Sequence, residues 1–260
     1  MEIGVCVKRV PQVGGRIVVT PDGQDVDTRM SGFAMSPHEE CAVEEAVRIT
    51  ERLGGSVSVL TLGPPEAAEQ LRDALALGAH RAVLLDSASQ EGGGREWGAI
   101  GTAAAIAAEA RRHATDGPGY DLLLMGNEAA DTGDYQVGVR VAHLLGWPCV
   151  TGIKHLEITA DRARAGREYQ GSQETFEVPL PAVITVKEGI NLPRYPSLPG
   201  RLRAKRAVIE QYQPQWQPEG LRKELLRVPQ TEQHQATVLG TGPDAVPALV
   251  HVLEELGVLR

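Results

Sequence analysis

The stretch DLLLMGNEAADTGDYQVG, residues 121–138, leads from a strongly apolar segment through a loop of small and acidic residues into a helix-like pattern. The loop contains no Lys, Arg or His, so an anion bound there would depend on main-chain N–H groups at the helix start. Its aspartates, Asp131 and Asp134, are expected to cap the helix or to bond ribose hydroxyls, and Thr132 is another candidate cap. A capped loop without a ligand explains the same pattern, and the spacing alone leaves both interpretations open.

No other arrangement of residues predicts catalysis. The phosphate-binding pattern GxxxxGK[ST], the dinucleotide pattern GxGxxG, and the hydrolase and metalloprotease patterns GxSxG and HExxH are all absent from the sequence. The three cysteines, Cys6, Cys41 and Cys149, lie far apart and show no CxxC spacing, which argues against a disulfide framework or a zinc site. Glu44 and Glu45 are neighbours that do not share a helical face, so both are expected in solvent.

The elements that must position the loop alternate between strands and helices. Apolar runs predict strands at 3–10, 56–63, 81–86, 120–126 and 148–153, and helical patterns predict helices at 36–55, 64–79, 97–113 and 134–146. The first helix has both ends marked, by Ser36, Pro37 and Glu39 at its start and by two glycines at its end. This rhythm predicts an α/β fold with an open, mostly parallel sheet and helices on both faces. Ligands of such sheets bind beyond the carboxyl ends of the strands, which here include the opening loop.

The alternation of strand and helix patterns ends after residue 152. Residues 153–178 predict antiparallel strands, and residues 182–188 predict one more buried strand. We therefore expect an α/β domain over 1–188, followed by an arm over 189–260. The first part of the arm is rich in proline and predicts neither helix nor strand, whereas residues 244–260 predict an amphipathic helix with Pro247 in its first turn.

Composition sets limits on function. The 260-residue chain has a formal net charge of −8, which argues against a general nucleic-acid binder. No apolar run approaches the ~18–20 residues of a membrane span, so no membrane insertion is expected. No secretory signal follows Met1, and we expect a soluble, cytoplasmic protein.

Four segments together carry a family resemblance: AVEEAVRI (42–49), LGPPEAAEQLRDALALGAHRAVLL (62–85), REYQGSQETFEVPLPAVITV (167–186) and NLPRYPSLPGRLRAKR (191–206). They resemble the beta subunit of electron transfer flavoprotein, and the similarity extends over nearly the whole chain. The resemblance implies a sheet of the adenine-nucleotide-hydrolase-like kind and a heterodimer with an alpha subunit that holds most of the FAD, with AMP bound in this chain. It implies an electron carrier, not an enzyme, that links flavin dehydrogenases to a membrane quinone oxidoreductase or another acceptor.

The resemblance also implies where ligands and partners bind. The AMP site would comprise Cys6, Ser36, Pro37, His38, Glu39, Leu62, Gly126, Asn127, Glu128, Ala129, Ala130, Asp131, Thr132, Gly133, Asp134, Tyr135, Gln136 and Val137, with main-chain donors from 130–137 on the phosphate. This site would make residues 1–188 a nucleotide-binding domain. Residues 189–260 would contain a partner-recognition loop and pack on the alpha subunit. Related chains anchor acyl-CoA dehydrogenases of fatty acid oxidation with a leucine at the position of Leu198. The resemblance therefore implies that the partner-binding residues are Arg194, Tyr195, Leu198 and Pro199.

Alternative functions remain open. Many AMP-binding members have Asn-Gln-Thr-Gly where this chain has Tyr135-Gln136-Val137-Gly138. The Gln-Val-Gly ending is similar to members that hold a second FAD in place of AMP and bifurcate electrons from NADH, although those members tend to have a small residue in place of Tyr135. A stand-alone nucleotide-binding protein of the same fold would have no use for the long arm. An adenylate transferase would need a phosphate-binding cation or a Ser-Gly-Gly loop.

Overall fold

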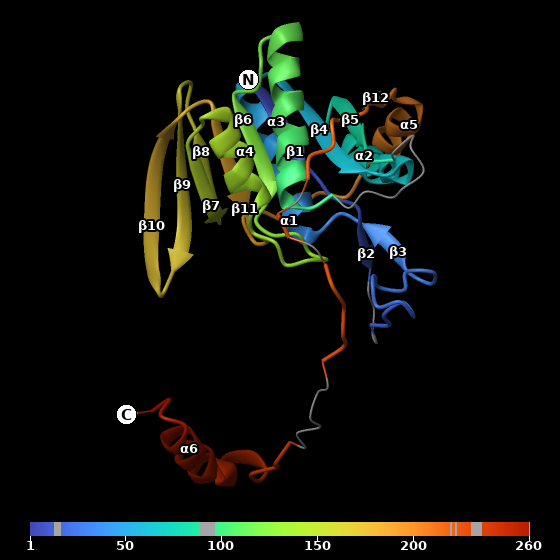
Figure 1. The fold of residues 1–260 in the computed structure, drawn as a ribbon. Coiled ribbons are helices and arrows are strands. Elements are labelled where there is room, and N and C mark those ends of the chain that lie inside the picture. The colour runs from blue at the N-terminus through green and yellow to red at the C-terminus, as the bar shows by residue number, and fades with distance from the viewer. Residues whose placement is uncertain (13–16, 89–96, 219, 222, 230–235, 260) are drawn as a thin grey trace.

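A seven-stranded sheet forms the centre of the computed structural model, which describes residues 1–12, 17–88, 97–218, 220–221, 223–229 and 236–259 (Figure 1). Its strands lie in the order β12-β5-β4-β1-β6-β11-β7, and every neighbouring pair is parallel. The strands are β1 (Glu2–Cys6), β4 (Ser56–Gly63), β5 (Arg81–Asp86), β6 (Leu122–Gly126), β7 (Cys149–Ile153), β11 (Ala182–Val186) and β12 (Glu210–Tyr212). The predicted open parallel sheet is confirmed.

Helices cover both faces of this sheet, as predicted. One face packs on α1 (Pro37–Leu53) and α2 (Ala68–Leu77), and the other packs on α3 (Ala99–Asp116) and α4 (Val137–Leu145). Strand β1 shows how one element serves both layers: Ile3 and Val5 face the α1 side, whereas Cys6 faces the α3 side. Such alternation follows from the two-residue period of a strand. It explains why the central strands appear in the sequence as continuous apolar runs.

Two smaller sheets flank the central one. Strands β8 (His155–Ile158), β9 (Arg162–Tyr169) and β10 (Ser172–Pro179) form an antiparallel sheet in the order β10-β9-β8, which confirms the antiparallel prediction for residues 153–178. Strands β2 (Val10–Gln12) and β3 (Gly32–Ala34) form an antiparallel pair that the sequence interpretation missed. Strands of three residues are too short to display a readable period. A 3-10 turn, η1 (Pro65–Ala67), precedes α2.

The prediction that the proline-rich segment lacks regular structure is wrong. Helix α5 (Leu198–Arg206) begins within it, with the Ser197 hydroxyl accepting a hydrogen bond from the Gly200 N–H and Pro199 in the first turn. Proline is tolerated there because the first helical N–H groups have no partner within the helix. Gly200 brings α5 onto α2, since a Cβ at that position would lie 2.6 Å from the Ala76 carbonyl oxygen.

Strand β12 then returns the arm to the edge of the central sheet. Glu210 accepts hydrogen bonds of 2.6 Å from both Nε and one terminal nitrogen of Arg81 in β5. The guanidinium of Arg112 lies 4.0 Å from the centre of the Tyr212 ring. These contacts join residues 198–212 to the α/β body. The predicted boundary at residue 188 between an α/β domain and an arm stays a prediction.

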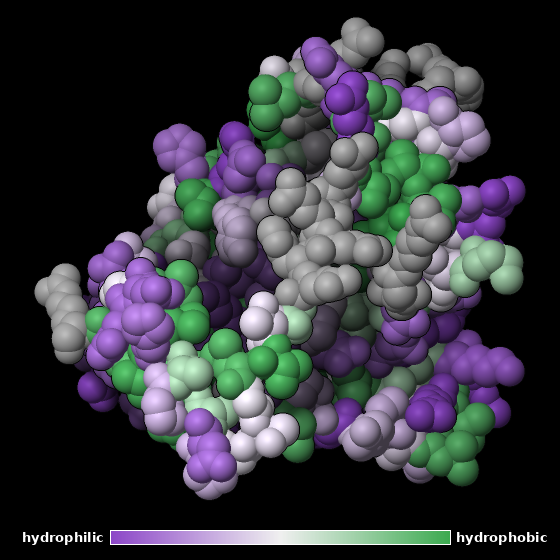
Figure 2. All heavy atoms as spheres, turned by 90° about the horizontal axis from the view of Figure 1, so that it is seen from below, coloured by the Kyte–Doolittle hydropathy of each residue, from purple (hydrophilic) through white to green (hydrophobic). Residues whose placement is uncertain are grey.

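The end of the chain leaves the body altogether. The turn η2 (Gly242–Ala245) leads into α6 (Val246–Glu255), with Pro247 in its first turn as predicted. Figure 1 shows α6 well apart from the sheet, and none of its residues is buried. Figure 2, a view from the side on which α6 lies, shows hydrophobic residues exposed among hydrophilic ones. Across the described ranges, no helix combines the length and apolar character that crossing a membrane requires.

Candidate functional site

The start of α1 forms one wall of the candidate site. Ser36 caps the helix by accepting a hydrogen bond from the Glu39 N–H at 3.3 Å, and the Glu39 carboxylate accepts one from the Ser36 N–H at 2.9 Å. This capping box confirms the sequence prediction for Ser36, Pro37 and Glu39. Gly126 at the end of β6 passes close by, because a Cβ there would lie 3.0 Å from Glu39 Cγ. A larger residue at position 126 would require the Glu39 side chain or the start of α1 to shift.

The loop after Gly126 is folded on itself. The Ala129 N–H donates to the Asp134 carbonyl at 2.9 Å, and the Gly133 N–H donates to the Ala129 carbonyl at 2.7 Å. The Asn127 N–H donates to the Val186 carbonyl, which ties the loop to β11. The prediction that Thr132 or Asp134 caps the next helix is wrong, because α4 begins at Val137 after Gln136 and has no side-chain cap. The N–H groups of its first turn therefore keep no side-chain acceptor.

A cavity of about 300 Å³ lies where these elements meet, at the carboxyl ends of β1, β4 and β6. Of the predicted site residues, it is lined by Cys6, Glu39, Leu62, Gly126, Asn127, Glu128, Ala129, Thr132, Asp134, Tyr135 and Val137. The structure thus brings together residues that the sequence separates by more than a hundred positions. The other predicted residues, Ser36, Pro37, His38, Ala130, Asp131, Gly133 and Gln136, lie beside the cavity wall but do not line it.

The loops that begin at Lys8 and Thr61 were expected at the ligand-binding edge of the sheet, but neither residue was among the predicted site residues, and both line the cavity. Lys8 follows β1 and its Nζ lies 2.7 Å from Asp131 Oδ1, so a cation does reach the loop that itself has none. Thr61 in β4 is buried, and its hydroxyl has no hydrogen-bond partner among the described residues. Both lie at or just after the carboxyl ends of central strands, and that position is the signal from which their place in the site could have been inferred. The α3 side of the cavity, including Trp97, Thr102 and Ile106, was also missed.

Burial controls the charge at the inner end of the cavity. Burial, together with the neighbouring Glu39, raises the pKa of the Cys6 thiol to about 12, so the thiol is neutral at ordinary pH. Burial also raises the pKa of Glu39 to about 7, against the opposing effect of the Ser36 and Lys8 contacts. A ligand would therefore meet a neutral thiol and a carboxyl group that titrates near neutral pH.

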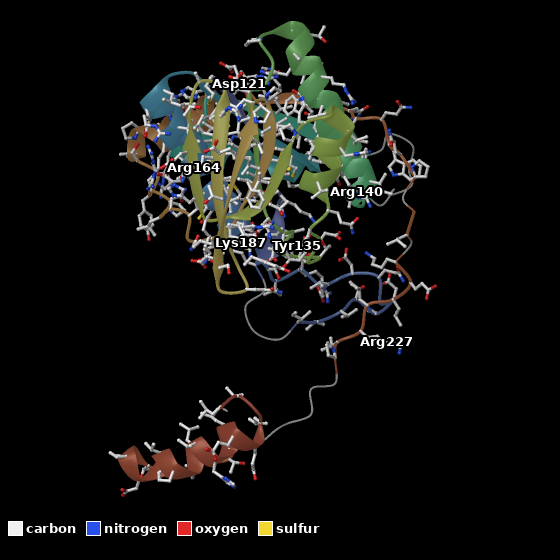
Figure 3. The ribbon with its side chains drawn as sticks, turned by 90° about the vertical axis from the view of Figure 1, so that its left-hand side faces the viewer. Asp121, Tyr135, Arg140, Arg164, Lys187 and Arg227 are labelled. Carbon is white, nitrogen blue, oxygen red and sulfur yellow. The ribbon has the colours of Figure 1, made fainter. Side chains whose placement is uncertain are left out.

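A second cavity of about 530 Å³ adjoins the first between α3 and α4. Tyr135 lines both cavities, while Gln136, Arg140 and Gln217 line the second alone. Figure 3 shows Tyr135 and Lys187 at one end of the central sheet and Asp121 at the other. The first cavity and the candidate loop thus lie at the end at which the parallel strands finish, and the second cavity extends along α3 and α4.

The predicted docking residues lie elsewhere, on the segment that leads into α5. Tyr195, Leu198 and Pro199 are exposed to solvent. Arg194 is instead paired within the chain to Glu44 and Glu51, at 2.9 Å and 2.6 Å. The prediction that Glu44 is solvated is wrong, because Glu44 is buried beneath this arginine.

Comparison with known proteins identifies the family to which this fold and its cavity belong. A model of the electron transfer flavoprotein domain matches residues 26–215. The chain is similar to the electron transfer flavoprotein subunit beta of Bacillus subtilis, with 34% identity over 81% of this chain and 78% of that protein. It is 34% identical to the Homo sapiens subunit over 82% of each chain. It is 37% identical to the mitochondrial subunit of Oryza sativa subsp. indica over 83% of each. These matches, on a parallel α/β fold with its cavity at the strand ends, show that the chain belongs to the electron transfer flavoprotein beta-subunit family.

Proposed function

We propose that this chain pairs with an alpha subunit to form an electron transfer flavoprotein that carries electrons from acyl-CoA-type flavin dehydrogenases to a quinone oxidoreductase or another acceptor. FAD, held chiefly by the alpha subunit, supplies the electron-accepting ring. The residues of this chain hold a structural AMP, cover part of the complex and present a docking segment. The exposed apolar face of α6, which includes Leu249 and Val250, supports an arm that packs on another subunit and not a stand-alone protein.

The cavity beyond the strand ends is the observation that carries the nucleotide proposal. Its volume of about 300 Å³ lies at the lower end of the ~300–1,000 Å³ typical of ligand sites, which suits a mononucleotide. The Thr61 hydroxyl supplies a buried polar group for the ligand, and the uncapped start of α4 and Lys8 supply donors for a phosphate.

The second candidate is a bifurcating protein with a second FAD in place of AMP. The adjoining cavity of about 530 Å³ favours it, because the two cavities together would suit a dinucleotide. Tyr135 lines both cavities, so a ligand that extends from one into the other must pass its side chain. The position of the Tyr135 side chain in this structure therefore supports AMP over a second FAD.

Nucleotide extraction from the purified heterodimer separates the two candidates. One FAD and one AMP per heterodimer would support the simple carrier, and two FAD would support bifurcation.

Thr61→Val tests the site itself. The hydroxyl has no partner among the described residues, so its removal should leave the nucleotide-free fold intact. If the ligand bonds this hydroxyl, AMP affinity should fall about tenfold, as expected for one lost hydrogen bond of ~1.4 kcal/mol. Unchanged affinity in a titration of the stripped heterodimer would mean that the nucleotide does not contact Thr61.

Leu198→Ala tests the docking segment. We expect reduction by the dehydrogenase to slow at least about tenfold, the effect of ~1.4 kcal/mol at an interface hot spot. Chemical reduction by dithionite and flavin content should not change. Equal dehydrogenase-driven rates for variant and parent would remove Leu198 as the anchor.

A further inference from the structure

A buried carboxylate on α1 holds the segment that precedes α5. Glu44 is only 1% exposed, and its Oε2 accepts hydrogen bonds from the Arg194 backbone N–H at 3.2 Å and from Arg194 Nε at 2.9 Å. A terminal nitrogen of Arg194 reaches Glu44 Oε1 at 3.2 Å. The same guanidinium donates to both oxygens of Glu51, at 2.6 Å and 2.9 Å. Most of the donors of Arg194 are therefore directed into its own chain and not toward a partner.

Other contacts fix the backbone on the preceding side. Arg48, which donates to Glu44 Oε1 at 2.5 Å, also donates to the Leu192 carbonyl at 3.0 Å. The side-chain amide of Asn191 donates to the Cys41 carbonyl and to Glu45, at 3.0 Å and 2.9 Å. Residues 191–194 are thus bound along α1 by hydrogen bonds that join positions nearly 150 residues apart in the sequence.

Three apolar side chains within and after this attached stretch are exposed to solvent. Leu192 is 83% exposed, Tyr195 94% and Leu198 72%. On the far side, Gly200 seats α5 against α2, so the exposed segment is held at both ends. The next turns of α5 carry the exposed cations Arg201, Arg203, Lys205 and Arg206 in a chain of net charge −8. Charge complementarity therefore favours a partner with an apolar contact surrounded by acidic side chains.

We propose that Glu44 and Arg194 form a clamp that arranges residues 192–198 before the partner arrives. This inference rests on the proposed function, which identifies the partner as a flavin dehydrogenase. Arg194 and Glu44 are positioning residues, because the groups that they use here are hydrogen-bonded within the chain. A segment that is already ordered loses less conformational freedom on binding, so the clamp lowers the dehydrogenase concentration needed for docking without altering electron transfer in the docked complex.

Arg194→Met is the test variant, since it removes the guanidinium and keeps an apolar stem, while Glu44 retains its contact with Arg48. Glu51→Gln is the matched control, because it alters the exposed partner of the same arginine. The measurements on the intact heterodimer are KM and kcat for dehydrogenase-driven reduction, the dithionite rate and the melting temperature. We expect Arg194→Met to raise KM at least fivefold and to leave kcat and the dithionite rate within twofold, and Glu51→Gln to change KM less than twofold.

Leu198→Ala separates the clamp from the docking segment itself. A raised KM in Leu198→Ala with an unchanged KM in Arg194→Met would overturn the clamp and leave the docking segment in place. A lowered melting temperature in Arg194→Met with an unchanged KM would also overturn it, since the ion pair would then serve only the fold. If Leu198→Ala has no effect either, the proposed docking function fails first. Glu44→Gln combined with Arg194→Met should raise KM no further than Arg194→Met alone, because the two residues act as one unit.

Discussion

Substitution of Glu39 by Gln should change how the stability of the protein depends on pH. Glu39 is 6% exposed, and burial raises the pKa of its carboxyl group from an ordinary 4.5 to about 7. Between these values the folded protein keeps a proton that the unfolded chain releases. The free energy of unfolding therefore falls as pH rises from about 4.5 to about 7, and above pH 7 the loss is complete. Below pH 4.5 both states are protonated and the group has no effect.

The size of the effect follows from the difference between the two pKa values. A difference of about 2.5 corresponds to roughly 3 kcal/mol, at about 1.36 kcal/mol for each factor of ten in proton affinity. Glutamine keeps an oxygen that can accept from the Ser36 N–H, so the capping box survives the substitution while the titration is removed. The difference in stability between parent and variant then isolates this one carboxyl group.

Urea unfolding of both proteins at pH 5, 6, 7 and 8, as nucleotide-free heterodimers, measures that difference. The stability of the parent relative to Glu39→Gln should fall by roughly 2–3 kcal/mol between pH 5 and pH 8. Contributions from other titrating groups are common to both proteins and cancel. Parallel pH profiles would refute the reasoning, because they would mean that the folded protein holds Glu39 ionised over this whole range.

Three further predictions concern packing and the arm. Gly138→Val should reduce the free energy of unfolding by about 1–3 kcal/mol, since a Cβ there would lie 2.6 Å from Thr185 Cγ2; an unchanged urea midpoint would contradict this. Arg81→Met should lower the free energy of unfolding by about 1 kcal/mol, because Glu210 is partly solvated. It should also speed proteolytic cleavage around β12, and equal cleavage rates in parent and variant would argue that this ion pair does not hold β12 in place. Removal of residues 242–260 should weaken association with the alpha subunit in sedimentation experiments and leave the melting temperature of the isolated chain unchanged; the reverse result would show that α6 packs on its own body.

The features that could be predicted from the sequence depend on residues close together in the chain. The start of α1 is an example, because Ser36, Pro37 and Glu39 create the cap within four positions. The central strands are another, since burial on both faces demands apolar residues throughout each run. The carboxyl ends of these strands then indicated where the cavity would lie.

The features that could not be predicted depend on partners distant in the sequence. Glu44 is buried because Arg194 lies 150 positions away, and β12 is held by an arginine 129 positions earlier. Lys8 reaches Asp131 across 123 positions, so the cation beside the loop comes from the segment that follows β1. Helix α5 forms among prolines because α2 offers it a surface. Local propensity carries no information about such contacts.

The order of strands in the sheet has a consequence for the synthesis of the protein. Strand β11 lies between β6 and β7, although it follows both in the chain, and β12 covers the edge of β5 only after residue 210 has been made. A nascent chain that has produced β7 has no neighbour to pair it with, and the edges of β5 and β6 stay open. Open strand edges bind other chains, and pairing over long separations is slow. The ribosome must therefore release most of the polypeptide before the sheet can close, and during that interval the unfinished protein is most exposed to misassembly.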